Sequence, residues 1–300
     1  MERPPVKLAC LFPGQGSQAV GMAKDHFSSS DSLKRRFEQA DDILGYSLAS
    51  IMFEGPEDRL RQTQYTQPAV FLHSVSLFET LDVQPDMTAG HSLGEFSAMV
   101  TSGAMTFEDG LGLVSARGSL MQQAGDKKPG TMAAVMGMDD ELVDIICEEA
   151  MAQTFKHVMP ANYNCPGQIV ISGDVKAVEA AMDLAKGRGC RLVKQLPVSG
   201  AFHSSLMESA YDELKEKLDQ VQLTRPHCPV YSNYTAEPTF DPDEIRENVL
   251  QQLMNPVRWT QTLQNMNRDG AGRFVEIGPG RVLQGLVRRT LADVEISGHQ

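Results

Sequence analysis

A serine flanked by glycines, between a predicted strand and a predicted helix, is the feature that most limits how this chain can fold. The sequence Gly90-His91-Ser92-Leu93-Gly94 follows a short extended segment at 86–89 and precedes an apolar helical segment at 93–102. A serine at this spacing is typical of a sharp strand-to-helix turn that exposes its hydroxyl group. Ser92 is therefore a candidate nucleophile. The alternative is that it is only a small residue in a glycine-rich turn.

Size, charge and cysteine content narrow the class of protein. The chain has 300 residues, 41% of them hydrophobic, enough for a large α/β domain with a smaller insertion. It has no apolar run of about 18 residues, and its first five residues lack a signal-peptide core, so we expect a soluble cytoplasmic protein without membrane contact. Five cysteines without a C-x-x-C pair suggest neither disulfides nor a metal site, and a net charge of −12 disfavours nucleic-acid binding.

A second glycine-containing loop follows the first apolar run of the chain. Residues 6–12 end at Pro13-Gly14-Gln15-Gly16, as a buried parallel strand does where it enters a loop at the carboxyl edge of a sheet. The loop lacks the Gly-Lys-Ser/Thr ending of a phosphate-binding loop. An oxyanion formed at Ser92 needs one N–H donor from the next residue and one from a separate loop, so Leu93 and Gln15 are the candidates. The alternative is that these glycines only form a turn.

One arginine falls on the apolar side of a predicted helix. Thr106 and Asp109 form a capping-box pattern, and apolar residues recur at helical spacing as far as residue 124. At about 100° per residue, Arg117 lies among them. A buried guanidinium needs an internal carboxylate or an anionic ligand that it can bind through two hydrogen bonds. We therefore expect a substrate with a carboxylate group, although Arg117 could instead extend to the edge of the apolar stripe and reach water.

Residues 129–197 have a pattern of their own. They contain strands at 131–136, 158–162, 168–172 and 190–196 and helices at 139–150 and 174–186. This βαββαβ order predicts a ferredoxin-like sheet with both helices on one face. We predict an α/β fold in which a large α/β-hydrolase-like domain with a parallel sheet, residues 1–128 and 198–300, carries an inserted ferredoxin-like subdomain, residues 129–197. A ligand is expected in the cleft between them.

His203 is the candidate general base. It lies in the loop at 197–205 that returns the chain to the large domain, whereas the histidines outside the serine motif have no polar residues grouped around them in the sequence. A neutral imidazole beside Ser92 could take the hydroxyl proton and return it to the leaving group. The alternative is a structural histidine. A strand at 273–277 and a helix at 282–291 form a late βα unit of the main sheet.

Several motifs together resemble the malonyl-CoA:acyl carrier protein transacylases. They occur in order along essentially the whole chain: FPGQGSQ at 12–18, GHSLGEFSA at 90–98, SARGSLMQ at 115–122, NYNCPGQIVISG at 162–173, GAFHSSLM at 200–207, QLMNPVRW at 252–259 and EIGPGRVLQGL at 276–286. Phe96 stands where such proteins often have tyrosine or tryptophan, a departure that changes none of the roles below.

The resemblance implies a role for each site residue. Ser92 is the acylated nucleophile and His203 its general base. The backbone N–H groups of Gln15 and Leu93 bind the oxyanion, and the main-chain carbonyl of Gln252 orients the imidazole in place of a triad acid. The substrate-binding residues that it implies are Arg117, Gln252, Phe202, Met121 and Asn164. Phe202, in an Ala-Phe-His sequence, resembles the residue of acyltransferases that select malonyl over methylmalonyl groups.

The implied reaction is a two-step acyl transfer in fatty acid or polyketide synthesis. The malonyl group passes from malonyl-CoA to Ser92 and then to the phosphopantetheine thiol of holo acyl carrier protein. No cofactor or metal is implied, because coenzyme A enters as part of a thioester substrate, and the resemblance favours a monomer. Two other functions stay open: a serine esterase or thioesterase of the α/β-hydrolase type, which would have no need of Arg117, and a non-catalytic carrier-protein-binding module.

Two stretches of the sequence contain basic residues and no acidic ones. The basic residues are Lys186, Arg188, Arg191 and Lys194 in the first stretch and Arg281, Arg288 and Arg289 in the second. We expect them to attract the acidic carrier protein and the phosphates of coenzyme A. The alternative is that they are an ordinary solvated surface.

Overall fold

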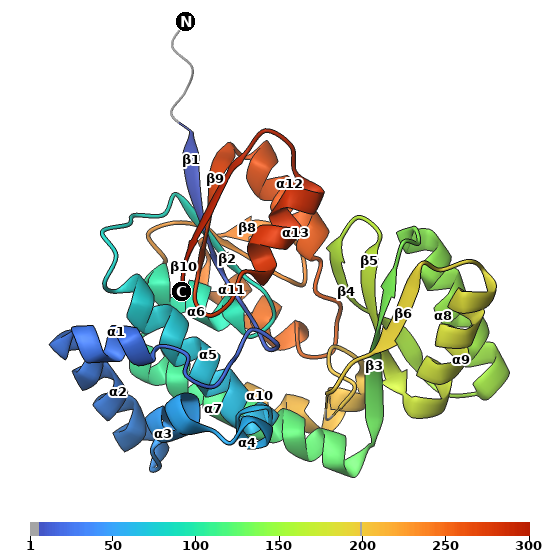
Figure 1. The fold of residues 1–300 in the computed structure, drawn as a ribbon, viewed down its shortest axis with the longest axis horizontal. Coiled ribbons are helices and arrows are strands. Elements are labelled where there is room, and N and C mark those ends of the chain that lie inside the picture. The colour runs from blue at the N-terminus through green and yellow to red at the C-terminus, as the bar shows by residue number, and fades with distance from the viewer. Residues whose placement is uncertain (1–5, 199) are drawn as a thin grey trace, which may run out of the picture.

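A six-stranded sheet forms the centre of the larger part of the molecule (Figure 1). The computed structural model describes residues 6–198 and 200–300; residues 1–5, where we expected no signal segment, and Ser199, in the loop before His203, lie outside them. The strands are β1 (Lys7–Phe12), β2 (Met87–Gly90), β7 (Val230–Tyr231), β8 (Pro238–Thr239), β9 (Ala271–Ile277) and β10 (Glu295–His299). Their order is β10-β9-β1-β2-β7-β8, and all neighbouring pairs are parallel except β7 and β8.

Both faces of this sheet are covered by helices. Along β1, Cys10 and Phe12 enter one apolar core, whereas Ala9 and Leu11 enter another. The helices that contribute to the first core include α5 (Thr63–Phe78), α6 (Gly94–Thr101) and α7 (Phe107–Lys127), and those of the second are α12 (Trp259–Arg268) and α13 (Val282–Thr290). Because successive side chains of a strand point to opposite faces, a strand covered on both faces is apolar throughout, as residues 8–12 are.

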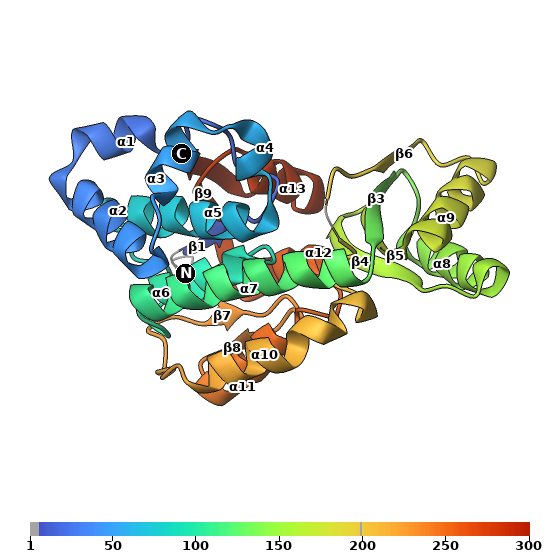
Figure 2. The same cartoon turned by 90° about the horizontal axis from the view of Figure 1, so that it is seen from below.

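Smaller helices surround α5 and α7. Before α5 come α1 (Lys24–Ser29), α2 (Asp31–Leu44), α3 (Leu48–Glu54) and α4 (Glu57–Leu60), and later in the chain come the short 3₁₀ turn η1 (Ser205–Met207), α10 (Glu208–Asp219) and α11 (Pro242–Gln251). Figure 2 shows α10 and α11 on the far side of α7 from α5. No elements were predicted between residues 24 and 78. Helix α5 is buried around its circumference and therefore lacks an apolar stripe, whereas α2 does carry one, at Leu33, Phe37 and Ala40, and was overlooked.

A four-stranded antiparallel sheet forms the smaller part of the molecule (Figure 1). Its elements are β3 (Gly130–Met136), α8 (Asp140–Thr154), β4 (Val158–Cys165), β5 (Gln168–Asp174), α9 (Val175–Gly187) and β6 (Leu192–Gln195), with strand order β4-β5-β3-β6. Ala133 and Val135 pack with α8 and α9, whereas Met132 and Val170 belong to the core of the larger part. The predicted order of elements is present, and the prediction of an α/β fold with a parallel sheet is confirmed.

The loops after β1 and β2 emerge at the same edge of the large sheet. Phe12 pairs with Gly90, and the His91 N–H donates a hydrogen bond to the Phe12 carbonyl at 2.9 Å. A Cβ atom on Gly94 would lie 2.1 Å from the Phe12 carbonyl oxygen, and one on Gly90 would lie 1.8 Å from the Gly94 carbonyl oxygen. The contact between the two loops therefore depends on the absence of side chains at both glycines.

We predict that Gly94→Ala lowers the free energy of unfolding by about 2 kcal/mol or more, because its methyl group would meet backbone that cannot move aside. Gly112→Ala is the matched control. Gly112 is an exposed residue of α7 with no atom within 4 Å of the added Cβ, so this change should stabilise the protein by roughly 0.5–1 kcal/mol. Urea unfolding of both variants tests the claim, and equal effects at the two glycines would contradict it.

Candidate active site

Ser92 lies in the tight turn between β2 and α6. Its φ of 53° is in the left-handed region, which non-glycine residues rarely adopt. Asn233 stabilises this turn: its side-chain oxygen accepts from the Ser92 N–H at 2.6 Å, and its amide nitrogen donates to the Gly90 carbonyl at 2.7 Å. The turn therefore has the strained strand-to-helix geometry that the sequence pattern predicted, with a buried amide that sequence analysis did not identify.

His203 is in direct contact with Ser92. Its Nε2 lies 2.8 Å from Ser92 Oγ, and its Nδ1 donates to the main-chain carbonyl of Gln252 at 2.8 Å. Since a carbonyl can only accept, the proton resides on Nδ1 and Nε2 is the acceptor for the serine hydroxyl. Burial, together with the nearby charge of Arg117, lowers the pKa of His203 to about 3. The imidazole is therefore neutral at pH 7 and able to accept a proton.

Arg117 is buried beside the same hydroxyl, as its place on the apolar side of α7 predicted. Its side chain is 1% exposed, and Nη2 donates to Ser92 Oγ at 3.2 Å. Nη1 donates to Gln67 Oε1 and Nη2 to Gln252 Oε1, both at 2.8 Å, and Nε has no partner among the described residues. Burial lowers the pKa of Arg117 to about 10, a shift that Glu95 opposes. The group remains a cation at pH 7, with hydrogen-bond donors to spare.

A buried carboxylate completes the cluster. Gln252 Nε2 donates to Glu95 Oε2 at 2.7 Å and to the Ser92 carbonyl at 2.9 Å, while the Asn233 N–H donates to the same Glu95 oxygen at 3.2 Å. Glu95 is 2% exposed, and burial raises its pKa to about 7. Sequence analysis missed Glu95, Asn233 and Gln67. The available signal was the acidic residue inside the otherwise apolar helix 93–102.

A small cavity joins these groups. It has a volume of about 110 Å³ and is lined by Gln15, Gln67, His91, Ser92, Leu93, Arg117, Met121, Met132, Asn162, Leu196, Val198, Phe202 and His203. Of the residues implied to bind substrate, Arg117, Met121 and Phe202 lie in its wall. Leu93 directly precedes the first turn of α6, where backbone N–H groups lack intrahelical acceptors. Leu93 and Gln15 are thus placed beside the hydroxyl, and their role as oxyanion donors stays a prediction.

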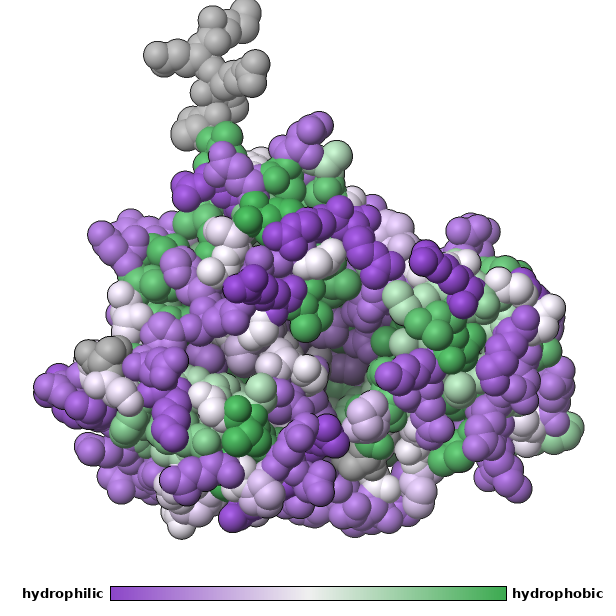
Figure 3. Space-filling model, in the orientation of Figure 1, coloured by the Kyte–Doolittle hydropathy of each residue, from purple (hydrophilic) through white to green (hydrophobic). Residues whose placement is uncertain are grey.

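A larger cavity of about 300 Å³ shares residues with the first. The shared residues are Gln15, His91, Asn162 and Leu196, and apolar side chains of β3, β5 and α13 form much of the rest of its wall. Asn164 lines this cavity and accepts a hydrogen bond from His91 Nε2 at 2.8 Å. Figure 3 shows the hollow between the two parts of the molecule. Because the two cavities adjoin at the shared residues, together they form a path that leads past β3, β5 and α13 to Ser92.

The seven basic residues of the predicted patch are all exposed, but they divide into two groups. Lys186 and Arg188, at the end of α9, form ion pairs with Asp183 and Glu149. Of the others, Arg191 directly precedes β6 and Lys194 lies in it, Arg281 directly precedes α13, and Arg288 and Arg289 lie near the end of α13. Arg289 donates a hydrogen bond to Gln168 of the larger cavity. Lys194 pairs across the sheet with Ala134, another residue of that cavity.

Two kinds of feature are absent from residues 6–198 and 200–300. No group of three or more histidine, cysteine or acidic side chains there could hold a metal ion. Among the helices described, none combines the length and apolar character needed to cross a bilayer.

Comparison with known proteins defines the class. The model of the acyl transferase domain family matches residues 10–298, and the chain belongs to this family. Its resemblance to malonyl transacylases, predicted from the motifs, is confirmed. It is 42% identical to the malonyl CoA-acyl carrier protein transacylase of Bacillus subtilis over 286 residues, which cover 94% of this chain and 90% of the relative.

Solved structures lead to the same group. An acyl carrier protein S-malonyltransferase from Vibrio cholerae superimposes with a TM-score of 0.94 at 40% identity, covering 98% of this chain and 97% of the other. A malonyl-transacylase in complex with a holo type II polyketide synthase acyl-carrier protein superimposes with a TM-score of 0.92 at 39% identity, covering 97% and 94%.

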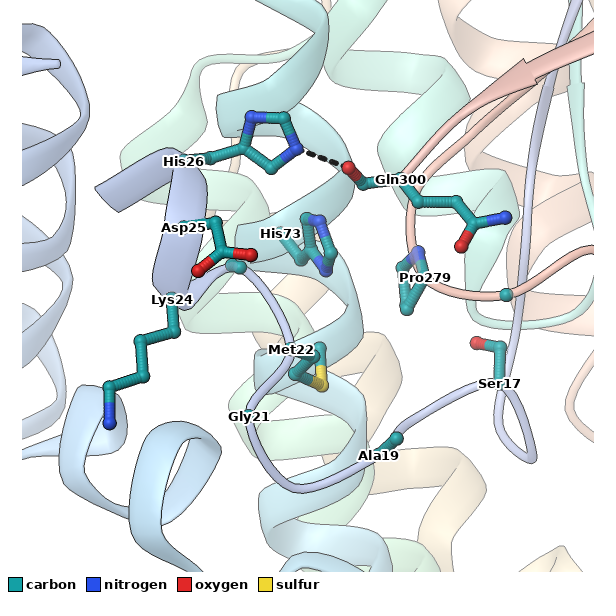
Figure 4. A pocket seen from close by; sticks show the side chains of 12 residues that line it. Ser17, Ala19, Gly21, Met22, Lys24, Asp25, His26, His73, Pro279 and Gln300 are labelled. Atoms are coloured by element: carbon teal, nitrogen blue, oxygen red, sulfur yellow. Dashed lines mark hydrogen bonds between the residues drawn. The ribbon is translucent and has the colours of Figure 1, made fainter. Parts of the chain in front are cut away.

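Another cavity, of about 380 Å³, lies apart from Ser92 (Figure 4). His73 of α5 faces it, with His26 and Asp25 nearby, and the ring centroids of the two histidines are 6.4 Å apart. The His73 side chain is 3% exposed, and neither ring nitrogen has a hydrogen-bond partner among the described residues. Burial, together with the neighbouring His26, lowers the pKa of His73 from 6.5 to about 4. His73 is therefore held neutral in the folded state.

We predict that His73 makes the protein sensitive to acid. Because its pKa is lower in the folded state, the unfolded chain binds the extra proton between pH 6.5 and about 4, and stability falls as the pH is lowered through this range. The loss amounts to about 3 kcal/mol at most. His73→Phe should reduce the pH dependence of urea unfolding, whereas His299→Gln, a change at an exposed histidine, should not. An identical pH dependence in wild type and His73→Phe would refute this role.

Proposed function

We propose that this chain transfers the malonyl group of malonyl-CoA to the phosphopantetheine thiol of holo acyl carrier protein through a malonyl-serine intermediate. The single observation that carries the proposal is the 3.2 Å contact between the buried Arg117 guanidinium and Ser92 Oγ. A malonyl thioester has a carbonyl at one end and a carboxylate two bonds away. A nucleophile and a cation in contact with each other match these two groups.

In the first step Ser92 Oγ attacks the thioester carbonyl carbon while His203 Nε2 accepts the hydroxyl proton. The N–H groups of Gln15 and Leu93 stabilise the negative charge on the carbonyl oxygen. When the tetrahedral intermediate collapses, the carbon–sulfur bond breaks and the proton passes from His203 to the thiolate of coenzyme A. The Gln252 carbonyl supports the brief imidazolium through its 2.8 Å hydrogen bond to Nδ1.

In the second step the phosphopantetheine thiol gives its proton to His203 and attacks the malonyl-serine carbonyl. Collapse of this intermediate returns the proton to Ser92 Oγ and releases malonyl carrier protein. The path formed by the two cavities supports this step, because a thiol on a long, thin arm can pass along it, beside the apolar side chains of α13, to reach Ser92. The mechanism uses no metal or cofactor.

The same residues account for selectivity. An acetyl group would occupy the site without a carboxylate for Arg117, leaving unsatisfied the guanidinium donors that a malonyl carboxylate would accept from. Phe202 lies in the cavity wall beside His203, where it would crowd a branched α-carbon. One methyl group changes discrimination by only ~1–3 kcal/mol, so rejection of methylmalonyl groups is weaker than rejection of acetyl groups.

The pathway, compartment, oligomeric state and fold type of the chain are also proposed. We assign the chain to fatty acid synthesis, with a polyketide carrier as the alternative acceptor, and expect a cytoplasmic monomer that binds no nucleic acid. We also describe the larger part, residues 1–128 and 198–300, as α/β-hydrolase-like, supported by its parallel sheet and nucleophile turn. The β4-β5-β3-β6 order supports a ferredoxin-like description of residues 129–197.

A serine esterase is the second candidate, since it would share the turn and the oxyanion donors. Burial of Arg117 beside the nucleophile favours the transferase, because a hydrolase of neutral esters gains nothing from a desolvated cation there. The products of the two reactions differ: free acid in one case and an acylated thiol in the other.

We predict that wild-type protein mixed with malonyl-CoA gains one malonyl group, detected by intact mass spectrometry, and that Ser92→Ala gains none. Arg117→Ala should lose at least about 100-fold in malonylation rate, since a charge-assisted bidentate contact is removed, while its low acetylation rate changes little. Absence of a malonyl adduct on the wild type would refute the transferase. Equal acylation of the wild type by acetyl-CoA and malonyl-CoA would refute the role of Arg117.

The basic residues at β6 and α13 are proposed to attract the carrier protein. Lys194 of β6 pairs across the sheet with Ala134 of the larger cavity and Arg191 directly precedes the same strand, whereas Lys186 is paired with Asp183 on α9. We predict that Arg191→Glu raises the KM for holo carrier protein about tenfold at low salt and less at high salt, whereas Lys186→Glu, the matched control, has a smaller effect. Steady-state transfer assays test this, and equal KM values for Arg191→Glu and the wild type at low salt would contradict it.

A further inference from the structure

Two oppositely charged side chains are buried near Ser92 without touching each other. Glu95 is 2% exposed and Arg117 is 1% exposed. No ion pair joins Arg117 to a carboxylate in the described chain. Instead the side-chain amide of Gln252 lies between them, accepting from Arg117 at 2.8 Å and donating to Glu95 at 2.7 Å. The mechanism above gives Glu95 no role.

The bridge fixes the direction of the amide. The oxygen of Gln252 faces the cation and its nitrogen faces the anion. Reversing the amide would place two hydrogen-bond donors together at Arg117 and two acceptors together at Glu95. Glu95 therefore holds Gln252 in the orientation that binds Arg117. It also supplies the negative charge nearest to the guanidinium, which opposes the effect of burial on the pKa of Arg117. A buried cation without any such charge would be strongly destabilising.

We propose that Glu95 is the counter-ion of Arg117 in the free enzyme and that the malonyl carboxylate replaces it, so that malonyl binding is coupled to uptake of a proton by Glu95. This inference rests on the proposed function, because it requires a carboxylate to arrive at Arg117. Glu95 is a positioning residue here, since it acts through Gln252 and does not touch the substrate.

The coupling follows from charge in a buried site. With the malonyl group bound, two carboxylates would share one guanidinium, and the cluster would carry a net negative charge in a low-dielectric environment. Protonation of Glu95 removes that charge. Burial already raises the pKa of Glu95 to about 7, so the proton is accessible near neutral pH.

The other titratable groups around Glu95 do not compete for this proton. Arg117 on α7 stays charged, and its pKa is about 10. His203, in the loop before η1, and His91, in the turn before α6, are both buried, and burial lowers the pKa of each. Gln252 and Asn233, which donate to Glu95, do not titrate. The pH dependence of malonyl binding near neutrality is therefore assigned to Glu95.

A substitution can separate charge from geometry. Both hydrogen bonds to Glu95 reach the same oxygen, Oε2, so the amide oxygen of Glu95→Gln can accept both while the negative charge is lost. Glu276→Gln is the matched control: this carboxylate is also buried, at 1% exposed, but it accepts from the backbone N–H groups of Leu283 and Gln284 at the start of α13.

The first measurement is the ratio of malonylation to acetylation rates at Ser92, followed by intact mass spectrometry from about pH 6 to pH 8. Ionisation of Glu95 weakens malonyl binding as the pH rises, so the wild-type ratio should fall about threefold or more. Both thioesters share the coenzyme A phosphates and use His203, so dividing by the acetylation rate removes the effect of these groups on the pH dependence. The ratio should be constant with pH in Glu95→Gln and fall in Glu276→Gln as in the wild type. A purely structural role for Glu95 would leave the pH dependence of Glu95→Gln unchanged and overturn the inference.

The second measurement keeps Glu95 intact and does not depend on how its variants fold. Titration calorimetry of Ser92→Ala with malonyl-CoA, in buffers of different ionisation enthalpy near pH 7, counts protons taken up on binding. We expect uptake of a substantial fraction of one proton with malonyl-CoA and none with acetyl-CoA. No difference between the two thioesters would refute the coupling. If the wild type forms no malonyl-serine at all, the proposed function fails; if it does but these signatures are absent, only the role of Glu95 fails.

Discussion

The site depends on one desolvated cation in contact with one hydroxyl group. Removing the Arg117 guanidinium from water is unfavourable, and the side-chain oxygens of Gln67 and Gln252 only partly replace its solvation. The positive electrostatic potential of the guanidinium therefore acts on the groups around it. It contributes to keeping His203 neutral, so that the imidazole can act as a base, and it favours the alkoxide form of Ser92. The same potential that prepares the nucleophile therefore also attracts the free carboxylate of a diacid.

The fold brings this cluster together from distant parts of the sequence. The Gln15 loop and Ser92 are adjacent because β1 and β2 are parallel neighbours whose carboxyl ends meet at one edge of the sheet. Gln252 follows α11 and contributes two different groups: its main-chain carbonyl holds His203, and its side chain holds Arg117. Rotation of this one residue would disturb the base and the carboxylate-binding group together, which explains why so many of its polar atoms are hydrogen-bonded.

Sequence reasoning succeeded where the physical signal is local and failed where it is not. The turn at Ser92, the buried position of Arg117 and the βαββαβ order follow from spacing and periodicity, which report on backbone neighbours. Asn233 and Gln67 reach the site through the fold alone, and nothing in their local sequence marks them. Helix α5 was missed because burial on all sides erases its periodicity and because Pro68 lies within it. For the basic residues, only the structure showed that Lys186 and Arg188 are paired with acidic side chains.

Whether the acyl-serine is transferred or hydrolysed depends on which nucleophile, the thiol or water, reaches its carbonyl carbon. Water and a thiol would both have to lose a proton to His203, so the base itself does not discriminate between them. The walls of the larger cavity contribute: Leu196, Leu283 and Leu286 give an apolar surface on which a flexible arm that carries a thiol can pack, beside polar residues that include Asn162 and Asn164. An anionic malonyl group held by Arg117 fills much of a cavity of about 110 Å³, leaving little room for ordered water beside the ester. The geometry therefore favours the thiol, which the path guides to the ester, over water, which finds little space beside the bound malonyl group.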